Sequence, residues 1–173
     1  AGVGKSDKEI YDAMMLGIEA FNCESLQEIF VINEMAHLHG VKANISVRIN
    51  PDIDAHTHKY VTTGLYENKF GISNHEFDKL IEFLQKSEHI NFFGLHFHIG
   101  SQITRVNEVF SLECKRVNEI VRYFESKGLT VKNINLGGGL SVDYDDPDGS
   151  PVADFETWFN AISSNIIRRK DQS

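Results

Sequence analysis

Short apolar runs alternate with longer amphipathic segments along most of this chain. The apolar runs lie at residues 20–23, 45–49, 90–97 and 131–136. In the segments around them, apolar residues recur every three or four positions, which is the spacing of helices that pack one face against a sheet. Alternation of this kind predicts an α/β fold with a parallel sheet and right-handed crossovers.

Most of the expected helices carry start or stop signals of their own. Ser6 and Ser25 are each followed three residues later by a glutamate, the pattern of a capping box. Asn74 is expected to cap a third helix and Gly128 to end a fourth. The expected apolar faces are Ile10, Met14 and Ile18; Leu26, Ile29, Ile32 and Ala36; Phe77, Leu80, Ile81 and Leu84; Phe110, Cys114, Val117, Val121 and Phe124; and Phe155, Trp158, Phe159, Ile162 and Ile166.

The length favours one domain, residues 1–173, because no repeat, linker or low-complexity segment divides the chain. Four strands and five helices suit either an open sheet or part of a (β/α)8 barrel. A complete barrel of that kind typically needs about 250 residues, so the barrel interpretation implies an incomplete one.

Charge and cysteine content narrow the function classes. The net charge of −8 argues against sequence-independent nucleic-acid binding, which depends on clustered Lys and Arg. No apolar run approaches the roughly 20 residues that span a bilayer, and no leader is visible at the start. Cys23 and Cys114 have neither metal-ligand nor redox-motif spacing, and two free thiols suit the cytoplasm. An anionic ligand stays possible, because backbone amides can bind phosphate on an acidic protein.

Polar residues end the third strand abruptly. The sequence Gly-Leu-His-Phe-His-Ile-Gly-Ser at residues 94–101 places His96 and His98 two apart, so both side chains share one face of the strand. Ionisable residues at the carboxyl end of a buried strand are typical of α/β active sites. Three interpretations are open: a metal-binding pair, contact with a flat aromatic cofactor, or core histidines with hydrogen-bond partners.

The fourth strand ends in three consecutive glycines, Gly137, Gly138 and Gly139. Each glycine in an ordered segment costs roughly 0.5–1 kcal/mol relative to alanine, so three in a row favour a special backbone requirement. Such a turn can bring amides close to a phosphate, although an ordinary left-handed turn is the alternative. Beside the histidine strand, it indicates a cofactor pocket.

Two further patterns are weaker. Gly4, Lys5 and Ser6 resemble the end of a phosphate-binding P-loop, but no strand precedes them. His56, His58 and Lys69 lie on or beside a long loop, residues 52–70, where substrate contact or simple solvation are both open.

Together these segments resemble the fold-type III, pyridoxal-phosphate-dependent amino-acid decarboxylases. Residues 55–58 and 98–103 look like the branch of that family that acts on diaminopimelate rather than the ornithine branch. The matching segments, in the order the family has them, are residues 4–10, 22–25, 48–51, 55–58, 63–64, 69–72, 94–103 and 135–140.

The resemblance implies a fold and a cofactor site. The chain would be the central part of an alanine-racemase-like (β/α)8 barrel, about strands 3 or 4 to 7, without the family's C-terminal β-domain. Pyridoxal 5′-phosphate is the implied cofactor, and no metal is implied. The resemblance assigns His98 to the pyridine ring, Ser101, Gly137, Gly138 and Gly139 to the phosphate with Gly139 foremost, Arg48 to the ring's hydroxyl side, and Lys69, His56 and His58 to the substrate or dimer interface.

The implied reaction is decarboxylation of meso-2,6-diaminopimelate to L-lysine and CO2 by a cytoplasmic homodimer. Related decarboxylases of ornithine, arginine or carboxynorspermidine are the nearest alternatives; an HxH metal hydrolase and a non-catalytic cofactor-binding module are more distant. The family's Schiff-base lysine stands in a Lys-Ala-Asn context on the first barrel strand. Here Lys42, Ala43 and Asn44 precede the Arg48 strand instead, which is the wrong position. We therefore expect no catalytic residue in this chain, and no activity from residues 1–173 alone.

Overall fold

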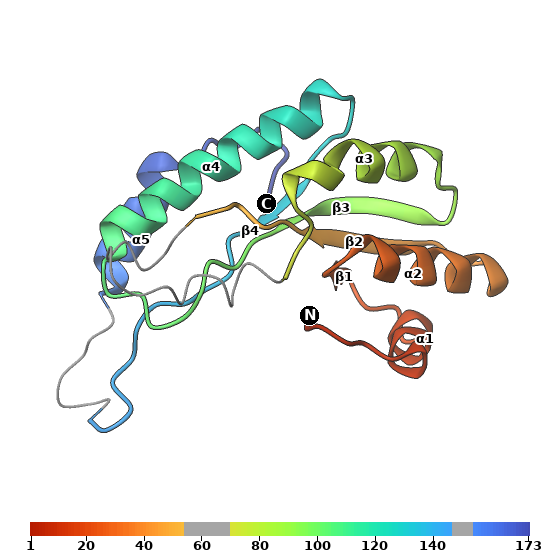
Figure 1. The fold of residues 1–173 in the computed structure, drawn as a ribbon, viewed down its shortest axis with the longest axis horizontal. Coiled ribbons are helices and arrows are strands. Elements are labelled where there is room, and N and C mark those ends of the chain that lie inside the picture. Colours follow the sequence, from red (N-terminus) through yellow and green to blue (C-terminus); the bar gives the residue numbers. More distant parts are fainter. Residues whose placement is uncertain (54–69, 147–153) are drawn as a thin grey trace.

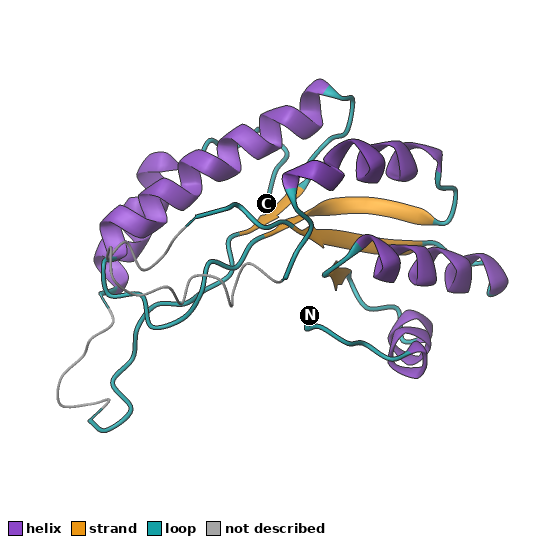
Figure 2. Ribbon diagram, in the orientation of Figure 1, coloured by secondary structure: helices purple, strands orange, loops and turns teal. Residues whose placement is uncertain are grey.

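The computed structural model describes residues 1–53, 70–146 and 154–173, and it confirms the alternation of strands and helices (Figures 1 and 2). A 3₁₀ turn, η2 (Asn74–Glu76), directly precedes α3. The strands are β1 (Phe21–Cys23), β2 (Ala43–Arg48), β3 (Ile90–His96) and β4 (Asn133–Asn135), and the α-helices are α1 (Asp7–Met15), α2 (Leu26–Leu38), α3 (Phe77–Lys86), α4 (Val106–Ser126) and α5 (Phe155–Asn165).

The four strands form one parallel sheet in the order β1-β2-β3-β4. The register places Arg48 beside His96, and His96 beside Asn135. All four strands therefore end at the same edge, and the polar residues that follow them are brought together there.

The two faces of the sheet differ in character. Ile45, Val47 and Leu95 are completely buried and belong to one core cluster with side chains from α2, α3 and α4. Helices α3 and α4 lie along the same side of the strands (Figure 2). The alternate positions of β2 carry polar side chains such as Ser46 and Arg48, which therefore lie on the opposite face of the sheet.

The sheet continues past β4 at its edge. The amide of Ser173 donates to the carbonyl of Lys132 at 2.9 Å, and the amide of Ile134 donates to the carbonyl of Ser173 at 2.8 Å. These are the two hydrogen bonds of a parallel bridge. Ser173 thus occupies the position in which a parallel barrel adds its next strand.

Two details of the expected helices are wrong. Helix α1 ends at Met15, before Ile18, because Gly17 adopts a positive φ of 67°. Asn74 does not cap α3: Ser73 and Glu76 form a capping box around the 3₁₀ turn η2, and Glu76 is the N-cap residue of α3.

The apolar face expected of α5 is also only partly correct. Trp158 and Ile162 pack on the small cluster around Phe110, whereas Phe155 and Phe159 are about two-thirds exposed, at 67% and 65%. The helix contacts its neighbours over a narrower stripe than its composition suggests. No helix among the described residues combines the length and apolar character needed to cross a membrane.

Candidate functional site

A buried ion pair lies where β1 and β2 end. Arg48 closes β2, and its guanidinium Nη1 lies 2.7 Å from Oε2 of Glu24, which directly follows β1. The two side chains are only 12% and 8% exposed. The guanidinium also lies 5.6 Å from the centre of the Phe70 ring. Such a pair is held in one geometry, because its charges cannot be separated without leaving one buried and unpaired.

His96 stands beside this pair on β3. Burial, followed by the nearby charge of Arg48, lowers the pKa of His96 to about 4. The imidazole is therefore neutral at physiological pH. Its Nδ1 atom is buried and has no hydrogen-bond partner among the residues described.

The histidine pair does not form a metal centre within the described structure. His98 is half-buried two residues beyond His96, close enough to contribute to lowering the pKa of His96. No group of three or more His, Cys, Asp or Glu side chains that could hold a metal ion occurs in residues 1–53, 70–146 and 154–173. A neutral, half-buried imidazole is instead suited to packing against a flat ring.

The loops that follow β3 and β4 run side by side (Figure 1). The amide of Ile103 donates to the carbonyl of Gly139 at 2.9 Å, and the amide of Ser141 donates to the carbonyl of Ile103 at 3.3 Å. This parallel bridge holds the glycine turn, residues 137–139, against the loop that carries Ser101.

Close backbone approach explains two of the three glycines. Gly137 has a φ of 75°, and a Cβ there would lie 2.3 Å from the carbonyl oxygen of Phe97. Gly139 has a φ of 105°, and a Cβ there would lie 2.0 Å from the carbonyl oxygen of Gly100. Any side chain at either position would require the loops to move apart.

Gly138 has no such explanation, because a Cβ there would meet nothing within 4 Å. In the described part of the chain, the amides of Gly138 and Gly139 donate to no group. Backbone amides without a protein partner are what an oxyanion such as phosphate requires. The structure thus places the loop that carries Ser101 alongside Gly138 and Gly139, and their assignment to a phosphate stays a prediction.

Three contributors to this edge lie in segments that match the family but are not among the predicted site residues. Glu24 anchors Arg48, Asn135 Oδ1 accepts a hydrogen bond from the Gly137 amide at 2.8 Å, and Gln102 binds the backbone of Val142. Glu24 and Asn135 lie at or directly after strand ends, the signal that had singled out the histidines. Gln102 offers no comparable signal.

Other candidates lie elsewhere. The Lys5 ammonium binds Glu28 Oε1 at 2.6 Å and the carbonyl of Asn22 at 2.8 Å, so it is held by protein groups rather than free for a phosphate. Lys42 precedes the amino end of β2, about 20 Å along the strand from Arg48, which confirms that it cannot face the same edge. His56, His58 and Lys69 lie outside the described residues.

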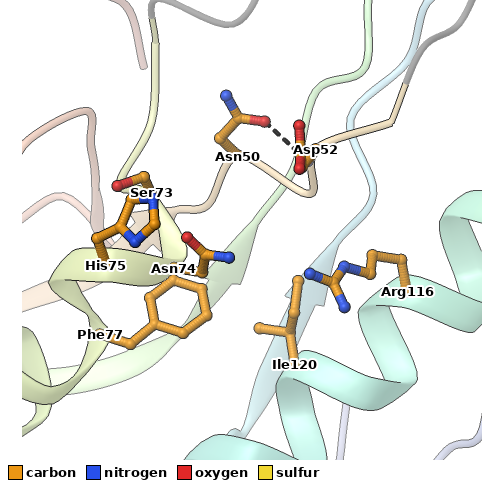
Figure 3. A pocket seen from close by; sticks show the side chains of 8 residues that line it. All are labelled: Asn50, Asp52, Ser73, Asn74, His75, Phe77, Arg116 and Ile120. Atoms are coloured by element: carbon orange, nitrogen blue, oxygen red, sulfur yellow. Dashed lines mark hydrogen bonds between the residues drawn. The ribbon is translucent and has the colours of Figure 1, made fainter.

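A separate pocket opens between the loop after β2, the start of α3 and helix α4 (Figure 3). Arg116 is the cation that lines it, with Nε donating to the carbonyl of Pro51 at 3.2 Å and Nη1 paired with Glu119 at 2.8 Å. None of the predicted cofactor residues lines this pocket. Its lining residues are Asn50, Asp52, Ser73, Asn74, His75, Phe77, Arg116 and Ile120.

Comparison with known proteins decides the family. Residues 1–172 match the family model described as pyridoxal-dependent decarboxylase, pyridoxal binding domain. The chain belongs to this family. The resemblance stated from sequence is confirmed, and membership decides against both the metal hydrolase and the P-loop interpretation.

The similar relatives are diaminopimelate decarboxylases. The one from Bacteroides thetaiotaomicron is 45% identical over 173 residues, which is all of this chain and 45% of that protein. The one from Aquifex aeolicus is 42% identical over 155 residues, covering 88% of this chain and 36% of that protein. The chain thus spans less than half the length of these relatives.

Solved structures confirm the partial-barrel fold class. Diaminopimelate decarboxylase from M. jannaschii matches with a TM-score of 0.82 at 34% identity, over 95% of this chain and 38% of that one. A variant of the Helicobacter pylori enzyme complexed with L-lysine matches with a TM-score of 0.77 at 36% identity, over 99% of this chain and 42% of that one.

The cofactor that this family implies fits the residues present. The unpaired amides of Gly138 and Gly139 suit its phosphate, and the partly buried imidazoles of His96 and His98 suit packing against an aromatic ring. The Arg48 guanidinium supplies a fixed positive charge at the same edge.

Proposed function

We propose that this chain is the pyridoxal-binding part of a decarboxylase that converts meso-2,6-diaminopimelate to L-lysine and CO2. The observation that carries the proposal is the pair of Gly138 and Gly139 amides, which have no hydrogen-bond partner in the described structure, in a chain that is 45% identical to a diaminopimelate decarboxylase. The Helicobacter pylori relative crystallised with L-lysine supports the product assignment.

Each residue at the strand edge has a proposed part. Ser101 and the amides of the glycine turn bind the phosphate, and His98 packs against the pyridine ring. Arg48, held by Glu24, places a positive charge near the ring's hydroxyl side. When bound, pyridoxal phosphate supplies the electron sink that accepts the electron pair left behind as the carboxylate departs.

The chain's own contribution is positioning and electrostatics. The Glu24–Arg48 pair has its geometry before any ligand arrives, so no reorganisation is needed at that point. His96 is neutral and does not protonate near pH 7, so it leaves the charge balance of the site to Arg48.

We further propose that the cofactor's lysine partner lies outside residues 1–173. These residues form a single incomplete barrel domain, and they alone do not release CO2 from the substrate. His56, His58 and Lys69 contribute to the substrate or dimer interface of a cytoplasmic homodimer that binds neither nucleic acid nor membranes.

The substrate assignment rests on the difference in sequence identity between decarboxylases that act on different substrates. The arginine decarboxylase of Paramecium bursaria Chlorella virus and the lysine decarboxylase of Selenomonas ruminantium are 24% and 20% identical, and they share the fold alone. Sequence identity to the diaminopimelate decarboxylases reaches 45%, so we propose diaminopimelate as the substrate.

The test is CO2 release by the purified full-length protein with pyridoxal phosphate, comparing meso-diaminopimelate with ornithine and arginine. We expect turnover of diaminopimelate alone. Equal or faster turnover of ornithine or arginine would overturn the substrate assignment, and no turnover of any of the three would overturn the decarboxylase assignment. Residues 1–173 expressed alone are the matched negative control.

A further inference from the structure

Gln102 joins the two loops that meet at the proposed phosphate site. Its side-chain Nε2 donates to the carbonyl of Val142 at 3.0 Å, and its Oε1 accepts from the amide of Val142 at 2.9 Å. One side-chain amide thus satisfies both backbone groups of a single residue, forty positions away in the sequence. This double contact acts as a clamp between the loop after β3 and the loop after β4.

The backbone at Gln102 is itself unusual. Its φ is 56°, and Asp52 is the only other non-glycine residue with a positive φ among those described. The left-handed region is unfavourable for a long side chain and persists only where surrounding contacts hold it. The two hydrogen bonds to Val142 are contacts of that kind.

The clamp lies next to the glycine turn. Ile103 follows Gln102 and forms the parallel bridge with Leu140, while Gly139 approaches the carbonyl oxygen of Gly100 so closely that a Cβ would lie 2.0 Å away. The clamp, the Ile103–Leu140 bridge and the close packing of Gly139 on Gly100 therefore fix the separation between Ser101 and the turn, and the clamp is the one made by a side chain.

We propose that Gln102 is a positioning residue for phosphate binding. It holds the glycine turn at the distance from Ser101 at which the free amides of Gly138 and Gly139 converge on one anion. This inference rests on the proposed function, since it concerns the phosphate end of the same cofactor.

The chemistry of the side chain explains why glutamine is suited to this position. Only a side-chain amide presents a donor and an acceptor in one plane, as the paired backbone groups of Val142 require. Asparagine tolerates a positive φ better than other residues do, but it is one methylene shorter and cannot span the same gap. Glycine tolerates the backbone conformation and has no side chain to form the clamp.

The experiment compares two cofactor forms in the full-length protein. Dissociation constants are measured by equilibrium dialysis for pyridoxal phosphate and for pyridoxal, which lacks the phosphate. The variants Gln102→Asn and Gln102→Gly each remove the clamp without forcing the backbone. The control Gln85→Asn removes a single hydrogen bond to the carbonyl of Lys127 at the far end of α3.

We expect pyridoxal phosphate to bind about tenfold more weakly to both Gln102 variants, the scale of one or two hydrogen bonds. Pyridoxal should bind all proteins equally, because the clamp acts on the phosphate end alone. An equal loss for both ligands would show general loosening and overturn the proposal, as would unchanged binding of pyridoxal phosphate. Wild-type protein that binds neither ligand would instead overturn the proposed function itself.

Discussion

Glu113 lies in the middle of α4 with its side chain completely buried. Phe110 and Val117, one turn to either side, are buried as well. In the described part of the chain, neither carboxyl oxygen has a hydrogen-bond partner. Burial raises the pKa of Glu113 to about 8, so the folded protein holds this residue as the neutral acid at pH 7.

The sign of the resulting pH dependence follows from proton linkage. In the unfolded chain Glu113 ionises near its ordinary pKa of 4.5, whereas in the folded protein it keeps its proton until about pH 8. Between these values the unfolded state gains stability with each step in pH, so the free energy of unfolding decreases as pH rises. At 1.36 kcal/mol for each pKa unit, the full decrease is about 5 kcal/mol, and it is complete a little above pH 8.

The variant Glu113→Gln keeps the size and polarity of the side chain but cannot ionise. We expect the two proteins to be closest in stability at pH 5, where the folded-state side chains are both neutral and the unfolded wild type has only begun to gain from ionisation, and the variant to be more stable than the wild type by several kcal/mol at pH 9. Glu113→Met removes the unsatisfied oxygens too, so it should be more stable at both pH values by a further 1–3 kcal/mol or so.

The measurement is urea unfolding of the full-length protein, followed by circular dichroism at intervals from pH 5 to pH 9. Glu108→Gln is the matched control, because Glu108 lies on the same helix, is exposed and pairs with Arg105. If the stability difference between wild type and Glu113→Gln stays constant over this range, the reasoning from burial is refuted.

Further expectations concern the strand edge. Gly139→Ala should lower the melting temperature, because Gly139 has a positive φ and the added Cβ would lie 2.0 Å from a carbonyl oxygen. Gly138→Ala should leave the melting temperature unchanged and weaken phosphate binding. Thermal unfolding and phosphate titration of both variants check this, and equal melting temperatures of the two variants would contradict it. Glu24→Gln and Arg48→Met should each lower the free energy of unfolding by about 3–5 kcal/mol, and the double variant should lose less than the sum of the two. A double-mutant cycle measured by denaturant unfolding checks this, and additive losses would refute the coupling. The His96 imidazole should remain neutral at pH 6 in an NMR titration, because its pKa is lowered to about 4; a midpoint near 6.5 would contradict its burial beside Arg48.

Local signals in the sequence were sufficient for the outline of the fold. Ser6 and Ser25 cap α1 and α2 as their spacing predicts, and Gly128 follows α4 with a positive φ of 87°. These signals act over a few residues, and no distant contact is needed to interpret them. The shared edge of the strands followed from parallel topology alone.

What the sequence left open depends on register and on packing between distant segments. Glu24 pairs with Arg48 because β1 and β2 lie side by side in one particular register, and no local sequence pattern links the two residues. Phe155 and Phe159 stay exposed while Trp158 and Ile162 pack on the cluster around Phe110, and hydrophobic spacing does not specify which residues of α5 make that contact. Gln102 reaches Val142 only after both loops have their final shape.

The three glycines of the turn look alike in sequence, but the structure gives them different roles. Gly139 was the foremost phosphate candidate, yet packing against Gly100 is a sufficient reason for a glycine there, and packing against Phe97 is sufficient at Gly137. Among the residues that the structure describes, none would exclude a side chain at Gly138. Open space at Gly138 and an amide without a protein partner are the features expected of a position that a ligand approaches. Gly138 therefore supports the proposed phosphate site, whereas Gly137 and Gly139 are explained by the close approach of the two loops.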